Sequence, residues 1–351
     1  MNLQQTIRNI KNLDEMAMTA ARARQESLTK PSGSLGRLED ISVQLAGILG
    51  QPVPSVRRKT IILAAGDHGV AAEGVSAYPQ EVTGQMVLNF LHGGAGINVL
   101  ARHAGAEVIV VDAGVASELP SDAALRCAKV RNGATGNIAR GPAMSREEVV
   151  KLLECGIVLA EEQASMGADL IGTGDMGIAN TTPSSAIVAV MTGHPPEKVV
   201  GRGTGLARKA WLHKVQIVRQ AIETNRPDSS DALGVLAGVG GFEIALLAGV
   251  MLGTAARRRA VVLDGFISGA AALIAHGLCP AIQPYFLAAH LSAEPGHRLT
   301  MAHLRLKPLL DLNLRLGEGT GAALAMGLIE AAARCLAEMA TFGEAGVSEK
   351  T

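Results

Sequence analysis

One glutamate near the C-terminus stands where a reactive carboxylate could be displayed. Glu318 lies between Gly317 and Gly319, and residues 320–326 that follow are rich in good helix formers. Glycine allows a close approach of the backbone, and the free N–H groups at a helix start attract a negative group. A lone glutamate between glycines is more often an ordinary loop residue. The local sequence therefore leaves two alternatives open, a catalytic carboxylate and a loop residue.

The segment 172–183 has the groups that hold a phosphate or a ribose. It follows a short apolar run and opens a helical pattern, so its backbone N–H groups are free to bind an anion. The alternative is a plain helix cap by Thr181 or Thr182, with Pro183 in the first turn. A cap does not require the preceding glycines, so the pattern favours ligand binding, with the carboxylate of Asp175 suited to a ribose hydroxyl. The candidate contacts in this segment are Asp175, Gly177, Ile178, Asn180 and Thr181.

A third loop, at 200–206, carries Gly203 and Gly205, and Lys214 follows it in a helical stretch. A lysine near glycine N–H groups can clamp a phosphate. The P-loop pattern is absent, and a single lysine on a helix is usually a solvated surface residue. This loop therefore indicates a phosphate site only in combination with the segment 172–183.

Asp67 and His68 stand between two glycines after another apolar run. They could ligate a metal or form a hydrogen-bonded turn. A metal site needs at least three ligands, and the sequence has no further cluster of metal-binding spacing. We expect a structural turn here and no metal.

These residues need a scaffold, and short apolar runs supply it. Six runs, each ending in glycine with a polar residue, predict buried strands at 59–65, 107–111, 169–172, 233–236, 260–263 and 280–287. Helical patterns at 84–104, 146–166, 207–224 and 242–257 lie between them. This alternation predicts an α/β fold with a parallel sheet of about six strands and flanking helices. Ligands of such sheets bind beyond the carboxyl ends of the strands, where the polar residues gather.

The two ends of the chain are helical in pattern. Residues 1–26 have apolar positions at helical spacing, the link 30–38 leads into a helix ending near Leu49, and a last helix spans about 319–341. We predict a small helical domain from residues 1–35 and 319–351, and a large α/β nucleotide-binding domain from residues 36–318.

Composition excludes several classes of protein. The 351 residues are 48% hydrophobic and 18% charged, which is not the composition of a disordered chain. Lys+Arg and Asp+Glu both number 32, so the balanced charge gives no reason to expect a nucleic-acid partner, and aromatics are only 2%. The four widely spaced cysteines indicate free thiols. No secretory signal and no membrane span of about 18 apolar residues is evident, so we expect a cytoplasmic protein.

Six motifs in order along the chain resemble those of one family: residues 65–70, 174–182, 240–243, 262–268, 292–294 and 315–323. The chain resembles the nicotinate-nucleotide–dimethylbenzimidazole phosphoribosyltransferases of the cobalamin lower-ligand pathway, from the link at 30–36 to the last helix. The resemblance implies a parallel Rossmann-like sheet domain, a small helical domain and a homodimer. It also implies transfer of 5-phosphoribose from nicotinate mononucleotide to 5,6-dimethylbenzimidazole, with α-ribazole 5′-phosphate and nicotinate as products and no metal or other cofactor.

The resemblance also assigns roles to residues. Glu318 matches the catalytic carboxylate of the family. Asp175 stands where a glutamate is expected and Ala179 where a glycine is usual, so the contact made by the shorter acid is altered. The nucleotide- and phosphate-binding set comprises Asp175, Gly177, Ile178, Asn180, Thr181, Gly203, Gly205, Lys214, Asp264 and Ser292. The base pocket comprises Tyr78, Gln85, Met86 and Leu316, although Met86 could equally belong to the core.

The reaction needs one general base. The pyridinium nitrogen of nicotinate mononucleotide leaves as a neutral ring, whereas the incoming imidazole must lose a proton. Burial of Glu318 beside Leu314 and Leu316 would raise its pKa toward a useful range. Attack on the face opposite the leaving group predicts inversion and the α linkage.

Two classes remain as rivals, a non-catalytic nucleotide-binding or sensor protein and a nucleotide-dependent oxidoreductase. The dinucleotide fingerprint GxGxxG does not follow the first strand, which removes the main support for the oxidoreductase. The hydrolase signature GxSxG is also missing. Release of nicotinate only when a benzimidazole is added would separate all three classes.

Overall fold

A six-stranded parallel sheet forms the centre of the molecule. The computed structural model describes residues 1–201 and 208–348. The strands are β1 (Arg58–Gly66), β2 (Ala106–Gly114), β3 (Leu125–Cys127), β4 (Ala168–Met176), β5 (Ala260–Leu263) and β6 (Phe286–Ala288). Their order across the sheet is β3-β2-β1-β4-β5-β6, as in doubly wound nucleotide-binding sheets. This order places β1 beside β4 although they are not consecutive in sequence, so the direction of strand succession reverses between them and a crevice forms beyond their carboxyl ends.

The central strands are apolar because both faces of the sheet are covered. Every residue of β1 after Arg58 is buried, and β4 and β5 are almost equally enclosed. Parallel pairing sets Leu63 opposite Gly174 and Ala64 opposite Asp175. This register brings the polar end of β4 to the same edge as the end of β1.

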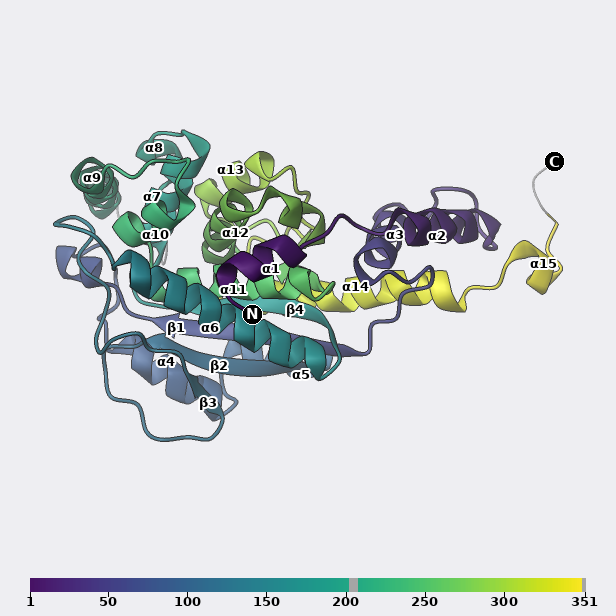
Figure 1. Cartoon of the computed structure of the whole chain (residues 1–351), viewed down its shortest axis with the longest axis horizontal. Helices are drawn as coiled ribbons and strands as arrows, with labels where there is room; N and C mark the ends of the chain where they lie inside the picture. The colour runs from purple at the N-terminus through teal and green to yellow at the C-terminus, as the bar shows by residue number, and fades with distance from the viewer. Residues whose placement is uncertain (202–207, 349–351) are drawn as a thin grey trace.

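Helices cover both faces of the sheet (Figure 1). The helix α11 packs on β1, β2, β4 and β5, with α6 and α1 outside it, while α14 and α5 pack on the other face. The helices on and around the sheet are α1 (Leu3–Asn9), α4 (Val82–Leu91), α5 (Gly96–Ala104), α6 (Arg146–Ser165), α7 (Thr181–Thr192), α8 (Pro196–Val199), α9 (Arg208–Asn225), α10 (Ala232–Val239), α11 (Phe242–Ala256), α12 (Phe266–Leu278), α13 (Pro295–His303) and α14 (Thr320–Glu338).

The predicted α/β fold with a parallel sheet of six strands is confirmed, but one predicted strand is wrong. Residues 233–236 belong to α10 instead, whose first turn is capped by the Asp231 side chain accepting from the Gly234 N–H. A short apolar run cannot be assigned by periodicity alone, and this cap selects the helix.

Two further boundaries differ from the prediction. The run 280–287 is mostly a 3-10 helix (Pro280–Tyr285), because its two prolines cannot donate to a sheet ladder, and only its end joins β6. The helical pattern at 84–104 is interrupted around Gly93, which has φ +77°, and gives α4 and α5. The prediction also missed one strand, β3. It has three residues, lies at the sheet edge and contains no apolar run, so only its pairing with β2 defines it.

Segments near the two ends of the chain form a helical lobe beside the sheet, whereas the N-terminus and α1 lie over the sheet (Figure 1). The lobe contains α2 (Glu15–Ser27), α3 (Arg37–Leu49), the end of α14 and α15 (Phe342–Ala345). A second core of Ala21, Leu28, Val43, Ala46 and Leu336 holds α2, α3 and the end of α14 together. The backbone of Thr29 also donates to Ala340, which ties the N- and C-terminal segments directly. The predicted boundary at residues 35/36 places α3 in the large domain, although α3 shares the core of the lobe. The domain division at residues 35/36 and 318/319 therefore remains a prediction.

One helix of the described residues, α14, is long and apolar enough to cross a membrane by length and composition. Of its most apolar window, 56% is buried inside the fold. The helix packs against α3, α5 and β4, which accounts for its apolar character as that of a core helix.

Candidate active site

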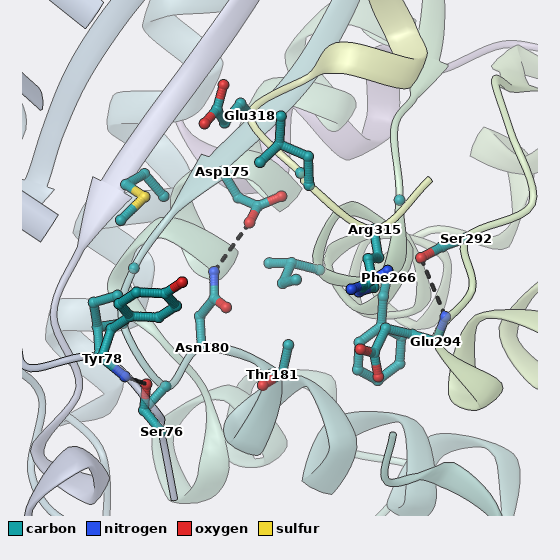
Figure 2. A pocket seen from close by; sticks show the side chains of 18 of the residues that line it. Ser76, Tyr78, Asp175, Asn180, Thr181, Phe266, Ser292, Glu294, Arg315 and Glu318 are labelled. Carbon is teal, nitrogen blue, oxygen red and sulfur yellow. Dashed lines mark hydrogen bonds between the residues drawn. The ribbon is translucent and has the colours of Figure 1, made fainter. Parts of the chain in front are cut away.

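A cavity of about 430 Å³ opens beyond the carboxyl ends of β4, β5 and β6. This volume suits a small organic ligand. Its walls come from the loop after β4, the start of α12, the segment after β6 and the turn before α14 (Figure 2). The lining residues given a role from sequence are Tyr78, Met86, Asp175, Gly177, Ile178, Asn180, Thr181, Lys214, Ser292, Leu316 and Glu318.

Glu318 is held in an unusual backbone conformation at the cavity wall. Its φ of +63° lies in the left-handed region, between Gly317 at +80° and Gly319 at +92°. Its N–H donates to the carbonyl oxygen of Asp175 (3.2 Å), which ties the turn to the end of β4. A side chain at Gly174 would clash with the backbone of Glu318. The strand and the turn can therefore approach this closely only because residue 174 is glycine.

The Glu318 carboxylate is buried but has one strong partner. Its Oε2 accepts from the Ile97 N–H (3.1 Å) in the first turn of α5, and no other donor among the described residues reaches the carboxylate. Burial raises the pKa of Glu318 above its ordinary value, the Ile97 N–H opposes this rise, and the charge of Asp264 adds to it. The arrangement leaves Oε1 available to accept a proton from a ligand.

Asp175 is the second carboxyl group of the cavity. Its Oδ2 accepts from the Asn180 amide (3.0 Å), as Figure 2 shows, while Oδ1 has no partner among the described residues. Burial raises the pKa of Asp175 well above its usual range, and the nearby charges of Asp264, Glu243 and Glu318 reinforce this rise in pKa. The Oδ1 atom therefore remains available for a hydrogen bond with a ligand.

Lys214 supplies a cation on the opposite wall. Its Nζ donates to the Thr181 hydroxyl (2.6 Å), and the residue is only 2% exposed. Burial lowers the pKa of Lys214 to about 8, and the charge of Glu294 opposes this change. Thr181 begins α7, so the ammonium group lies near a helix N-terminus, where the helix dipole favours an anion. The Thr182 N–H donates to the Ala179 carbonyl oxygen (2.9 Å) and Pro183 has no N–H, so the backbone contributes few donors here. This corner is suited to a phosphate.

The segment after β6 forms the third wall. The Ser292 N–H donates to Nδ1 of His297 (2.9 Å), and the Ser292 hydroxyl accepts from the Glu294 N–H (3.4 Å). Burial, together with the nearby His290, lowers the pKa of His297 to about 3. His297 is therefore neutral, as its acceptor role at Nδ1 requires.

Two assigned residues do not reach the cavity. Gln85 is exposed on α4 and does not line the cavity, because neighbouring residues on a helix point about 100° apart and Met86 faces inward. Asp264 is 1% exposed, and its carboxylate accepts from the N–H groups of Gly319 (3.2 Å) and Ala322 (3.0 Å). It therefore holds the first turn of α14 instead of touching a ligand. Gly203 and Gly205 lie outside the described residues.

Several lining residues carried no assignment from sequence: Val75, Ser76, Phe266, His290, Glu294 and Arg315. Phe266, Glu294 and Arg315 stand inside the six motifs, and His290 follows a predicted strand, so their positions at strand ends could have identified them. Val75 and Ser76 stand in none of the six motifs, and only the nearby Tyr78 was assigned to the base pocket. No group of three or more His, Cys, Asp or Glu able to hold a metal occurs within residues 1–201 and 208–348.

The fold and the cavity define an α/β protein with a nucleotide-sized site at the carboxyl edge of a parallel sheet. Residues 10–347 match the family model described as "Phosphoribosyltransferase". The chain belongs to this phosphoribosyltransferase family.

Relatives and solved structures agree with this membership. The chain is 58% identical to the nicotinate-nucleotide–dimethylbenzimidazole phosphoribosyltransferase of Roseiflexus sp., over 99% of this chain and 98% of the relative. It is 57% identical to the enzyme of the same name from Chloroflexus aggregans, again over 99% of this chain and 98% of the relative. The crystal structure of CobT from Thermus thermophilus superposes with a TM-score of 0.92 at 49% identity, covering 95% of this chain and 100% of that one.

Proposed function

We propose that this chain transfers 5-phosphoribose from nicotinate mononucleotide to 5,6-dimethylbenzimidazole. The products are α-ribazole 5′-phosphate and nicotinate, and the reaction belongs to the synthesis of the cobalamin nucleotide loop. The full-length relatives that carry this enzyme name support the proposal. The observation that carries it is Glu318, a buried carboxylate at the cavity wall with one oxygen bound and the other available.

The mechanism follows from the charges of the substrates. When the bond from C1′ to the pyridinium nitrogen breaks, nicotinate leaves with a neutral ring nitrogen, so the leaving group needs no acid. The attacking benzimidazole nitrogen becomes bonded to C1′, and the proton on its other nitrogen passes to Glu318. General-base help of this kind contributes about 10²–10⁴ in rate. Attack opposite the leaving ring inverts C1′.

Substrate positioning would supply the remaining rate enhancement. Lys214 and the start of α7 bind the 5′-phosphate, with Ser292 on the neighbouring wall. Asp175 and Asn180 bind the ribose, and its developing positive charge is stabilised by the pocket carboxyl groups, by analogy with glycoside chemistry. Tyr78, Met86 and Leu316 contact the base on the apolar side. No step requires a metal, because no pyrophosphate leaves.

An ultraviolet assay of nicotinate release tests the proposal. Nicotinate should appear only when the enzyme, nicotinate mononucleotide and a benzimidazole are all present, in equal amount to the ribazole phosphate formed. Binding of the nucleotide without release would identify a nucleotide sensor, and a redox change of an added nicotinamide cofactor would identify an oxidoreductase. Either result would overturn the proposal.

A homodimer and a cytoplasmic location are further proposals. Met16 and Leu328 are exposed apolar side chains of α2 and α14 that a second subunit could cover, and light scattering would show a mass twice that of the chain. The four cysteines are free, which fits a reducing compartment, and cell fractionation would test the location.

A further inference from the structure

Two motifs that the proposed reaction does not use meet under the floor of the cavity. His68 follows β1, and Glu243 lies in the first turn of α11. The His68 Nε2 atom lies 3.0 Å from Oε1 of Glu243, and both side chains are at most 1% exposed. Burying charged groups is costly unless they are paired, and a pair of this kind often serves specificity more than stability. Because burial of the pair is costly, we expect it to have a role in function.

Glycines from three different segments make room for the pair. A Cβ added at Gly66 would lie 3.1 Å from Oε2 of Glu243, and one at Gly241 would lie 2.6 Å from the His68 ring. A Cβ at Gly177 would lie 3.1 Å from Nε2 of His68. Because Gly177 lines the cavity, the imidazole supports the cavity floor directly from below.

Asp67, the neighbour of His68, holds the next floor residue. Its Oδ2 accepts from the Ala116 N–H (2.8 Å), and the Thr83 hydroxyl also bonds to this carboxylate. The Thr83 oxygen in turn accepts from the Ile178 N–H (3.0 Å). Adjacent residues at the end of β1 therefore fix the adjacent floor residues Gly177 and Ile178.

The pair also acts electrostatically on the cavity. Burial by itself disfavours the charged imidazole, but the carboxylates of Glu243 and Asp67 outweigh it and raise the pKa of His68 above its ordinary value. The charge of Glu243 is in turn one of those that raise the pKa of Asp175, with Asp264 and Glu318. A protonated His68 therefore compensates the negative charge of Glu243, which lies behind the cavity.

We infer that His68 is a positioning residue of this enzyme, which supports the cavity floor at Gly177 and compensates the charge of Glu243 behind Asp175. His68 is not a catalytic residue, because it is buried beneath the floor. The kinetic part of the inference rests on the proposed function, whereas the support of the floor does not.

The test compares His68→Gln, Glu243→Gln and the double variant with the native enzyme. His68→Gln leaves the Glu243 charge uncompensated. We expect kcat/KM for nicotinate mononucleotide to fall by roughly tenfold to a hundredfold, as for a small displacement of substrate-binding groups. The acidic limb of the pH profile should move to higher pH, because an uncompensated negative charge favours protonated carboxyl groups. The double variant, which removes both charges, should recover part of the loss and move the limb back.

Hydrogen exchange of the free enzyme gives a readout that needs no turnover. The amides of residues 177–180 should exchange faster in His68→Gln than in the native protein. Glu330→Gln is the matched control, since it breaks the ion pair with Lys59 on the same strand β1, at the end away from the cavity. The control should leave both the exchange of residues 177–180 and the pH profile unchanged.

Each outcome decides the inference. A folded His68→Gln with native kinetics, pH profile and exchange overturns it, and so does a lower melting temperature with the pH profile unmoved. Faster exchange at 177–180 in His68→Gln, together with a native protein that releases no nicotinate, supports the floor contact while refuting the proposed function.

Discussion

Glu318 combines a strained backbone with a selective electrostatic environment. A left-handed conformation costs a non-glycine residue about 1–2 kcal/mol, and it persists here because the turn is bonded to β4 and to Asp264 on both sides. The same turn buries the carboxylate, while the N-terminus of α5 keeps its ionised form accessible. Burial thus raises the pKa of Glu318 and makes it a better base, while the Ile97 N–H limits the rise.

Replacement of Glu318 by glutamine should abolish most turnover while leaving nucleotide binding intact. The amide keeps the size and the contact region of the side chain but cannot accept the proton of the benzimidazole. We expect kcat to fall by about 10²–10⁴ in the nicotinate-release assay, with the Kd for nicotinate mononucleotide, from calorimetry, nearly unchanged. Glu338→Gln, at the exposed far end of α14, is the control. Turnover of Glu318→Gln close to the native rate would remove Glu318 from the role of base.

Lys214 predicts a basic limb in the pH dependence. Its pKa of about 8 means that the cation is present below that pH and is lost as the pH rises through it. Phosphate binding should weaken with this loss, so kcat/KM for the nucleotide should decline above pH about 8. In Lys214→Arg the limb should disappear from this range, because a guanidinium stays charged. A basic limb that is the same in both proteins would assign it to another group.

The loop between β4 and α7 contains an alanine in a strained backbone conformation. The loop between β4 and α7 turns back over the sheet through Ala179, whose φ is +73°. Alanine pays for this conformation with strain that glycine would not have. The departure from the usual glycine at this position therefore has a structural cost, and it lies in the loop that carries Asp175 and Asn180.

Replacement of Ala179 by glycine should stabilise the protein. Relief of the left-handed strain should raise the free energy of unfolding by about 1 kcal/mol, less what the added flexibility of the unfolded chain removes. Denaturant titration measures this change. Ala20→Gly, on an exposed and regular part of α2, should instead lower the free energy of unfolding by about 0.5–1 kcal/mol. A loss of stability in Ala179→Gly would contradict the strain argument.

The described part of the molecule has two hydrophobic cores with different roles. The large core fills both faces of the sheet and holds the strand ends that form the cavity, whereas the small core joins α2 and α3 to the end of α14 in the helical lobe. The helix α14 links them, because its first turn follows Glu318 and its last turns carry Leu336 of the small core.

Truncation of Leu336 should weaken the lobe without changing the site. Leu336→Ala should lower the free energy of unfolding by about 2–5 kcal/mol, the range for a fully buried leucine. The KM for nicotinate mononucleotide, measured where the protein is folded, should be unchanged. Leu212→Ala, at a leucine of α9 that is 47% exposed, should change stability by about 0.5 kcal/mol or less. A rise in KM for Leu336→Ala would show that the lobe also shapes the cavity.

The local pattern of apolar residues predicts much of the fold, but it misleads where an apolar run is short. The long buried runs of β1, β2 and β4 and the helices α6, α9 and α11 are recognisable from composition and period alone. Four apolar residues at 233–236 satisfy a strand and a helix equally, and only the cap by Asp231 separates them. The strand β3 has no hydrophobic pattern of its own. It is defined only by its hydrogen bonding to β2, which lies elsewhere in the chain.

The amino-acid sequence by itself determined the class of fold and the family, and it indicated Glu318 as the candidate base, because glycine-flanked polar residues are a local feature. Only the tertiary structure decided which of those residues share one cavity. It assigned Asp264 to the first turn of α14, left Gln85 outside the cavity, and brought His68 under its floor beside Glu243. The physical reason is that a side chain's environment, and hence its pKa and its partners, depends on segments that are distant in sequence and adjacent only after packing.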